Sequence, residues 1–334
     1  MPSALVGDRV RFFAVLFAPL LVVLGGCPNG GSQLRDNPDF ADAARYTFGQ
    51  FENPEEADLA FAVRRLEREL YLTADLEASS TGDRALVVAA LRAEDVEGFA
   101  ETPDVYPEGF DRAGEEILPG SASPLAVATL STFEVPQHSF YPTLEDQRLV
   151  EPGSPNHYDR SFIQGTEVCW GDRSCNVLRT ENNLTKQNAL LQMTYDLSKD
   201  YRWVDLNLPD PASIPEGEVI INDGPARWAI VGRSWNPQSA VGDAGANAIF
   251  QSYSIEIWVP RDGGGFIRDG SEDNADGGEW TTDSAGEGTL RMMAVWAETS
   301  FGMNALVEQV TRDGIDDIFD AQEEWLETAP DERN

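Results

Sequence analysis

Lysine is scarce in this sequence, and basic residues as a whole are few. Only Lys186 and Lys199 are lysines among 24 basic residues, against 58 acidic residues, and the formal net charge is −34. Such a charge repels phosphate backbones, so it excludes nucleic acid as a partner, and it argues against docking by charge on anionic lipid. Two explanations fit the preference for arginine: a GC-rich genome, and life in salt, where surface carboxylates hold water.

Histidine is also rare, and the motifs of several enzyme classes are missing. The two histidines, His138 and His157, lie in a proline-rich region where an exposed loop position is the more common case. The sequence has no G-x-S-x-G elbow, no P-loop and no dinucleotide fingerprint. No pair of carboxylates stands out among so many. The sequence therefore assigns no catalytic residue and favours a protein that is not an enzyme, with a hydrolase as the weaker alternative.

The start of the chain is typical of an export signal. The apolar run from Phe12 to Leu24 follows two arginines and is too short for the roughly 20 residues that a membrane-spanning helix requires. The next residues, "LGGC", resemble the lipobox of bacterial lipoproteins. That resemblance implies removal of residues 1–26 and, on Cys27, a thioether-linked diacylglycerol and an amide-linked acyl chain such as palmitate. The alternative is an ordinary secreted protein in which this cysteine is incidental.

The resemblance to lipoproteins also implies a location in the cell. Inner-membrane lipoproteins commonly carry Asp after the lipidated cysteine, whereas this chain carries Pro28. The resemblance therefore implies an outer-membrane lipoprotein that faces the periplasm or the cell surface, with its acyl chains as the membrane link.

The cysteine count agrees with export. If Cys27 is lipidated, Cys169 and Cys175 remain, six residues apart in "CWGDRSC". Outside the cytoplasm such a pair predicts a disulfide that closes a small loop and stabilises the fold by roughly 2 to 3 kcal/mol. A zinc site would need further ligands nearby, and the two-residue spacing of a redox-active pair is absent.

Composition and periodicity divide the chain into four segments. Residues 1–26 form the signal peptide, and residues 27–38 hold the lipidated cysteine and a flexible tether rich in Gly, Pro and Asn. Apolar residues at helical spacing within 39–80 predict a helical hairpin that packs on the main domain. Residues 81–334 are predicted to form that single globular domain.

Alternating apolar residues predict several strands in the main domain. They occur in "LAVATLSTFEV", "LLQMTYDL", "RWVDLNL", "EVIIN", "RWAIVGRSW", "FQSYSIEIWV" and "TLRMMAVWAE". The turn at Asp223–Gly224 predicts a hairpin, and apolar spacing predicts a helix over 304–326. The predicted class is α+β: an N-terminal helical hairpin, then an antiparallel sheet closed by a long C-terminal amphipathic helix.

This order of elements over residues 185–327 resembles the helix-grip arrangement of lipid-transfer and polyketide-cyclase-like domains. The alternative is a plain one-sided sheet packed on helices. Several strands are apolar on both faces, so both faces must be covered. A second sheet or the helical hairpin would do this, or a cavity for an apolar molecule between sheet and helix, for which the candidate lining residues are Trp258, Met292 and Trp296.

One acidic loop has the spacing of a calcium site. In "EDNADGGEWTTD" the candidate ligands Glu272, Asn274, Asp276 and Asp283 occupy oxygen-donor positions of an EF-hand-type loop, with glycine at the sharp turn. The loop departs from that family at its first and last positions and in its flanking strands. A plain solvated loop explains the same residues.

These observations lead to two main functional hypotheses. The first is an exported, membrane-anchored lipoprotein that is not an enzyme and binds an apolar small molecule or lipid in a sheet–helix cavity. The second is a structural or interaction lipoprotein of the cell envelope, with a filled core and another envelope protein as its partner.

Overall fold

The computed structural model describes residues 40–73, 86–87, 123–187, 192–208, 227–238, 240–242, 248–261, 265–268, 278–281, 288–299 and 304–328. The lipobox, the tether, the segment "EVIIN" and the turn at Asp223–Gly224 lie outside these ranges.

Within the described ranges, nine strands form one antiparallel sheet in the order β1-β2-β11-β8-β6-β5-β4-β3, with β7 paired to β8. They are β1 (Leu86–Val87), β2 (Ser123–Ser131), β3 (Tyr158–Gln164), β4 (Val177–Gln187), β5 (Gln192–Asp205), β6 (Trp228–Trp235), β7 (Ala240–Val241), β8 (Ala248–Pro260) and β11 (Thr289–Thr299). Two short strands, β9 (Gly265–Arg268) and β10 (Gly278–Thr281), pair separately. The antiparallel sheet predicted from alternation is confirmed.

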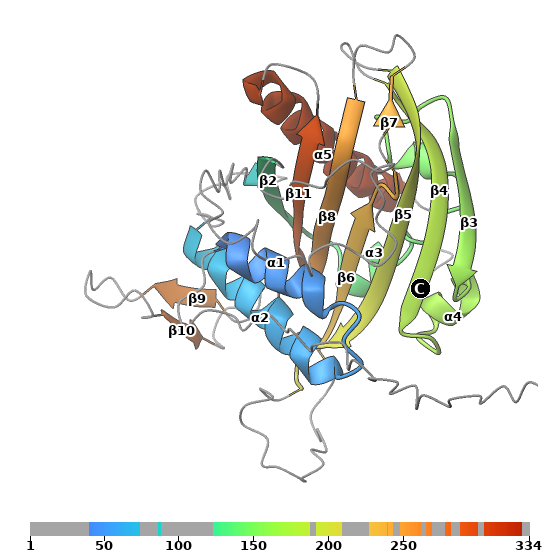
Figure 1. The fold of residues 1–334 in the computed structure, drawn as a ribbon. Helices are drawn as coiled ribbons and strands as arrows, with labels where there is room; N and C mark the ends of the chain where they lie inside the picture. Colours follow the sequence, from blue (N-terminus) through green and yellow to red (C-terminus); the bar gives the residue numbers. More distant parts are fainter. Residues whose placement is uncertain are drawn as a thin grey trace, which may run out of the picture. The chain divides into compact units, whose positions relative to one another are not determined.

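Helices cover both faces of this sheet (Figure 1). The predicted hairpin is α1 (Phe40–Gln50) with α2 (Glu56–Thr73), and the predicted C-terminal helix is α5 (Asn304–Thr328). Short helices α3 (Val135–His138), η3 (Gln147–Leu149) and α4 (Glu167–Gly171) lie between strands. The α+β class is therefore confirmed. None of the helices in the described part of the chain is both long and apolar enough to cross a membrane.

The face of the sheet under α1 and α2 is packed with apolar side chains, and we call it the apolar face. It carries Val204, Leu206, Val231, Tyr253, Ile255, Ile257, Met292 and Trp296. Phe48 of α1 meets the ring of Tyr253 edge-on, with centroids 5.6 Å apart, and Tyr253 stacks on Trp296 at 5.2 Å. Each large apolar side chain buried in this way contributes roughly 1.5 to 3 kcal/mol, so this face supplies much of the driving force for folding.

Strand β5 differs from the sequence prediction in one respect. Residues 192–197 of "LLQMTYDL" and residues 202–205 of "RWVDLNL" belong to one continuous strand of 14 residues rather than to two. Tyr201 and Trp203 point to the face opposite the apolar face, whereas Val204 and Leu206 belong to the apolar face. Because both faces of the sheet are covered, apolar residues can occupy odd positions in one part of the strand and even positions in the next. This shift in the alternation led the sequence analysis to predict two strands.

Candidate ligand site on the polar face of the sheet

The second face of the sheet carries buried charged and hydroxyl groups, and we call it the polar face. In strand order its polar side chains include Tyr158, Arg160, Thr180, Asn182, Lys186, Lys199, Tyr201, Ser234, Ser254, Glu256, Trp258 and Arg291. Residues that lie directly opposite one another on adjacent strands form two neighbouring rows across the sheet. Lys199 stands between Thr180 and Ser234, and in the next row Gly232 stands between Tyr201 and Glu256. The segment from α3 to Glu151 and helix α5 cover this face.

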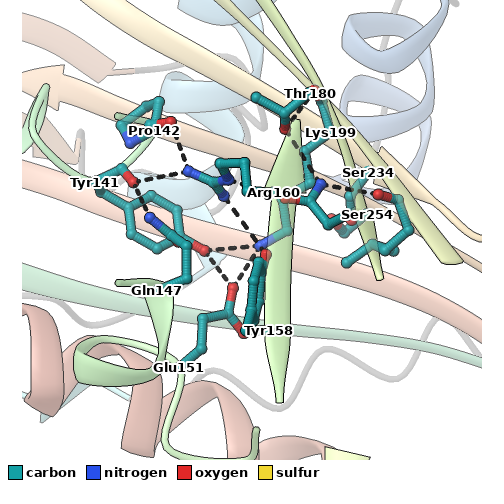
Figure 2. A network of polar contacts seen from close by, with 12 residues as sticks. Tyr141, Pro142, Gln147, Glu151, Tyr158, Arg160, Thr180, Lys199, Ser234 and Ser254 are labelled. Atoms are coloured by element: carbon teal, nitrogen blue, oxygen red, sulfur yellow. Dashed lines mark hydrogen bonds and ion pairs between the residues drawn. The ribbon is translucent and has the colours of Figure 1, made fainter. Parts of the chain in front are cut away.

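Both lysines of the chain bind the same buried carboxylate, that of Glu151, which follows η3. Lys186 Nζ lies 2.8 Å from Glu151 Oε2, and Lys199 Nζ contacts Oε1 (Figure 2). The Tyr141 hydroxyl donates to Glu151 Oε1 at 2.7 Å and accepts from Lys199 Nζ at 3.0 Å. Burial alone would raise the pKa of Glu151, but the two ammonium groups outweigh burial and hold that pKa far below its usual range. Glu151 is therefore an ionised anchor.

The covering segment is fixed to the sheet by further hydrogen bonds. Arg160 donates from Nε to Asn182 Oδ1 at 2.9 Å and from Nη1 to the carbonyl of Pro142 at 2.5 Å (Figure 2). Gln147 Nε2 donates to the carbonyls of Tyr141 and Leu144 at 2.9 and 2.8 Å. These bonds place Tyr141 over the polar face.

Besides Arg291 Nε, three polar atoms of the strands on this face have no hydrogen-bond partner among the described residues. They are Tyr201 Oη, Glu256 Oε2 and Trp258 Nε1, on side chains that are only 1, 4 and 2% exposed. Tyr201 and Glu256 flank Gly232 in the same row, and the Trp258 ring lies 6.4 Å from that of Tyr201. Since more than about 90% of buried polar groups in proteins are hydrogen-bonded, three neighbouring exceptions mark a place where water or a ligand would supply the missing partner.

The surroundings of Glu256 disfavour its ionised form. Burial raises the pKa of Glu256 to about 7; Lys199 lowers it only in part, and the charge of Glu151 raises it further. Burial likewise keeps the pKa of the Tyr201 hydroxyl well above its ordinary value, so this hydroxyl keeps its proton.

Gly232 allows the aromatic side chains of this face to approach the sheet. A Cβ at this position would lie 3.0 Å from ring atoms of Tyr201 and 3.3 Å from Cζ3 of Trp258. Rings of Tyr141, Tyr201 and Trp258 lie within 6.0 to 6.4 Å of one another, and Trp170 and Trp203 at 5.3 Å extend this aromatic wall. The unpartnered polar atoms therefore lie among large apolar surfaces.

Helix α5 is held to the same face by a second polar network. Arg291 donates to Gln322 and to Glu323, the latter at 3.3 Å, and Ser131 Oγ donates to Glu323 Oε1 at 2.6 Å. His138 Nε2 lies 3.0 Å from Ser131 Oγ. Because the single proton of Ser131 is given to Glu323, His138 Nε2 is the donor to Ser131, the reverse of what a general base would do.

The two histidines differ in their burial. His138 is buried, not exposed in a loop as expected, and burial lowers its pKa well below the ordinary value, so the imidazole is neutral. His157 is half-buried and lies 2.7 Å from Asn183 Oδ1.

The structure separates the three candidate cavity residues. Trp258 lies on the polar face, whereas Met292 and Trp296 lie on the apolar face beneath α1 and α2. The backbone of one sheet stands between them, so they do not line one cavity. Of the three, only Trp258 belongs to the candidate site.

The predicted disulfide is confirmed. Cys169 and Cys175 are bonded, with Cα atoms 5.2 Å apart, and close a loop around α4. Trp170, inside this loop, is buried; its Nε1 donates to Ser139 O at 3.0 Å, and its carbonyl accepts from Trp203 Nε1 at 3.2 Å. The disulfide loop thus fixes one end of the aromatic wall.

The lipidation and calcium predictions fall on residues outside the described ranges. These are Cys27, Glu272, Asn274, Asp276 and Asp283. In the ranges that are described, no group of three or more His, Cys, Asp or Glu side chains is arranged to hold a metal ion.

No family model matches this chain, and no curated protein matches it. One similar solved structure is that of TTHA0849 from Thermus thermophilus, which is 12% identical, with 62% of this chain and 98% of that chain covered and a TM-score of 0.31. A likeness at this score carries no argument about fold or function.

Proposed function

We propose that this chain is an exported, lipid-anchored protein that binds a small, largely apolar molecule between the polar face of its sheet and the cover formed by α5 and the α3–Glu151 segment. The observation that carries the proposal is the group of three buried atoms without a partner, Tyr201 Oη, Glu256 Oε2 and Trp258 Nε1. Leaving each such group unsatisfied costs about 1 to 3 kcal/mol, and a ligand that pairs with them would recover that cost.

The aromatic wall supports an apolar body for this ligand. Small-molecule sites are lined mostly by apolar and aromatic side chains, with a few polar groups that fix orientation. Tyr141, Trp170, Trp203 and Trp258 provide the first kind of surface, and the unpartnered atoms provide the second.

Binding fits the observed chemistry better than catalysis does. Lys199 is held as an ammonium by Glu151, and the pair Ser131–His138 is oriented against activation of the serine. Neither arrangement supplies a free nucleophile next to a base. We therefore propose a binding role rather than a hydrolase.

The membrane anchor is part of the same proposal. The lipobox-like "LGGC" supports acylation of Cys27, and a protein held at the outer membrane by acyl chains would be well placed to carry an apolar molecule. Intact-mass measurement of the protein purified from its host tests this part. We expect a chain that begins at Cys27 with the mass of a diacylglycerol and an acyl chain; a chain that begins upstream or carries no lipid would refute it.

Native mass spectrometry of the mature chain from residue 27, with Cys27→Ala and no detergent, tests the binding part. We expect a fraction of the protein to carry a small molecule that is released on denaturation. Tyr201→Phe removes a hydroxyl that has no partner in the protein, so it should reduce the occupied fraction without lowering the stability of the ligand-free chain. Trp258→Phe should also reduce the occupied fraction, but it removes part of a buried ring and should lower that stability as well.

Tyr141→Phe is the matched control for these variants. Its hydroxyl bonds both Glu151 and Lys199, so its removal should lower the free energy of unfolding by about 1 kcal/mol, unlike that of Tyr201. A wild-type chain that shows only its own mass, with water alone at these atoms, would overturn ligand binding.

The alternative, an interaction lipoprotein of the cell envelope, has one observation in its favour. β3 is the last strand at one side of the described sheet, and its side chains Phe162 and Ile163 are 42 and 58% exposed; Val168 of the following helix is 75% exposed. An exposed sheet edge with apolar side chains is a surface to which another protein can add a strand. An empty polar face in the experiment above would favour this function.

A further inference from the structure

The charges on the polar face indicate what kind of polar group the ligand carries. The chain as a whole has a formal net charge of −34, yet this interior has more cations than anions facing it. Glu151 alone serves Lys186 and Lys199, and Glu323 pairs with Arg291. One positive charge therefore remains around Glu151 after pairing.

Arg160 adds to this excess. Its hydrogen bonds go to Asn182 Oδ1, to the carbonyls of Tyr141 and Pro142 and to the Tyr158 hydroxyl, which are all neutral groups. No carboxylate of the described residues forms an ion pair with it. Glu256 is the one further acid on the strands of this face, and Asp320 of α5 also acts on Arg291. When Glu256 is protonated, the balance is still positive.

The unpartnered atoms can all act as hydrogen-bond donors. Trp258 Nε1 can only donate, the Tyr201 hydroxyl keeps its proton, and burial favours the protonated form of Glu256, which donates as well. An acceptor with two oxygen atoms would satisfy them. An ammonium group would offer no acceptor to the N–H of Trp258, because both groups are donors, and it would add to the positive charge.

We infer that the polar group of the ligand is an anionic acid, such as a carboxylate on an apolar body, bound by Tyr201, Glu256 and Trp258 beside the cations of the polar face. This inference rests on the proposed binding function. A carboxylate would balance the excess charge and would accept charge-assisted hydrogen bonds, which are roughly twice as strong as neutral ones. A neutral alcohol of the same length would fill the same apolar space but would leave the charge unbalanced.

A matched series of three probes tests the inference. Dodecanoate, dodecanol and dodecylammonium share one chain and differ only in the head group, and their binding to the mature Cys27→Ala chain at neutral pH can be measured by titration calorimetry after removal of any carried molecule. We expect dodecanoate to bind at least about tenfold more tightly than dodecanol, and dodecylammonium to bind more weakly than either.

Two variants separate head-group recognition from burial of the chain. Tyr201→Phe keeps its ring and should weaken dodecanoate by about tenfold and dodecanol by less, because the alcohol depends mainly on the apolar wall. Trp258→Phe also removes part of that wall, so it should weaken both probes, and dodecanoate more. Phe162→Ala, on the exposed edge strand, should leave all three affinities unchanged.

The outcomes distinguish this inference from the proposed function. If dodecanol or dodecylammonium binds as tightly as dodecanoate, binding stands and the acidic head group is wrong. If none of the three probes binds, the inference is overturned, and the carried molecule in native mass spectrometry then decides on the proposed function alone. A carried molecule that contains no acidic group would overturn the inference as well.

Discussion

The two faces of one sheet differ sharply although they alternate residue by residue along the same strands. On the apolar face, Tyr253, Ile255 and Ile257 of β8 pack against α1 and α2; on the polar face, the alternate residues Ser254, Glu256 and Trp258 lie beneath a hydrogen-bonded cover. Apolar packing lowers the free energy of the fold at every contact, whereas buried charges are costly unless they are paired. The comparison shows that one face serves stability and that the other keeps polar groups at a cost in stability.

Charged residues near the apolar face attach the turn between α1 and α2 to the sheet, which is a different role from that of the charged residues on the polar face. Arg202 Nη1 donates to the carbonyls of Phe51 and Asn53 at 2.9 and 2.8 Å, which fixes the turn between α1 and α2 on the sheet. Arg233 pairs with Asp200 at 2.8 Å and with Glu52 of the same turn. These contacts attach a helical hairpin to the sheet, whereas those of the polar face attach its cover and surround Tyr201, Glu256 and Trp258.

Removing one aromatic side chain from the apolar face should give the largest loss of stability. Phe48→Ala deletes a fully buried ring between α1 and Tyr253, and we expect the free energy of unfolding to fall by about 4 kcal/mol, measured by urea denaturation. Phe162→Ala, at an exposed position, is the control and should cost less than about 0.5 kcal/mol. A loss below about 1 kcal/mol for Phe48→Ala would show that this face is not the main source of stability.

Breaking the ionic cluster of the polar face should have the next largest effect. Glu151→Gln leaves Lys199 buried without a carboxylate, and Lys186 partly so, and should lower the free energy of unfolding by about 3 kcal/mol. The exposed pair Asp146–Arg148, at 2.7 Å, offers the control, because Asp146→Asn should cost less than about 1 kcal/mol. Equal effects of the two variants would mean that burial does not distinguish these ion pairs.

A third substitution on the polar face should act in the opposite direction and depend on pH. The folded state raises the pKa of Glu256 from 4.5 to about 7, so the ligand-free protein carries no penalty below pH 4.5 and the full penalty above about pH 7. Glu256→Gln should therefore raise the free energy of unfolding at pH 8 by at most about 3 kcal/mol and change it little at pH 4.5.

Denaturation at these two pH values measures this difference. Glu181→Gln, at an exposed position of β4, is the control and should change stability by less than about 0.5 kcal/mol at either pH. If Glu256→Gln is destabilising at pH 8, the carboxylate has a favourable partner that the structure does not show, and the polar face is less strained than we infer.

The elements of the fold could be predicted because local pattern determines them. Alternation in "FQSYSIEIWV" predicted the strand β8, and helical spacing predicted α1, α2 and α5. The same method failed in β5, where both faces are buried and apolar residues change sides. It also could not show that Trp258 faces away from Met292 and Trp296, because alternation sorts residues within one strand, and only the register between β8 and β11 relates the two strands.

The candidate site could not be predicted, for a physical reason. Glu151 lies 35 and 48 residues from its partners Lys186 and Lys199, and only the folded sheet brings them together. Glu256 was one of 58 acidic residues with nothing local to distinguish it. The one available signal was the scarcity of lysine. A residue type that occurs only twice points to the positions where it does occur, here Lys186 and Lys199 of the candidate site.

The shared ion pair of Glu151 has a consequence for the covalent chemistry of the surface. Both side-chain primary amines of the chain are engaged by this one carboxylate beneath the cover, and acylation of the N-terminal amine, as proposed, would remove the remaining one. Reagents that need a free amine, from glycating sugars to cross-linking esters, would then react slowly, because Lys199 is buried and Lys186, whose side chain is 24% exposed, is held as an ammonium by Glu151. Such a protein would react little with carbonyl compounds in its surroundings.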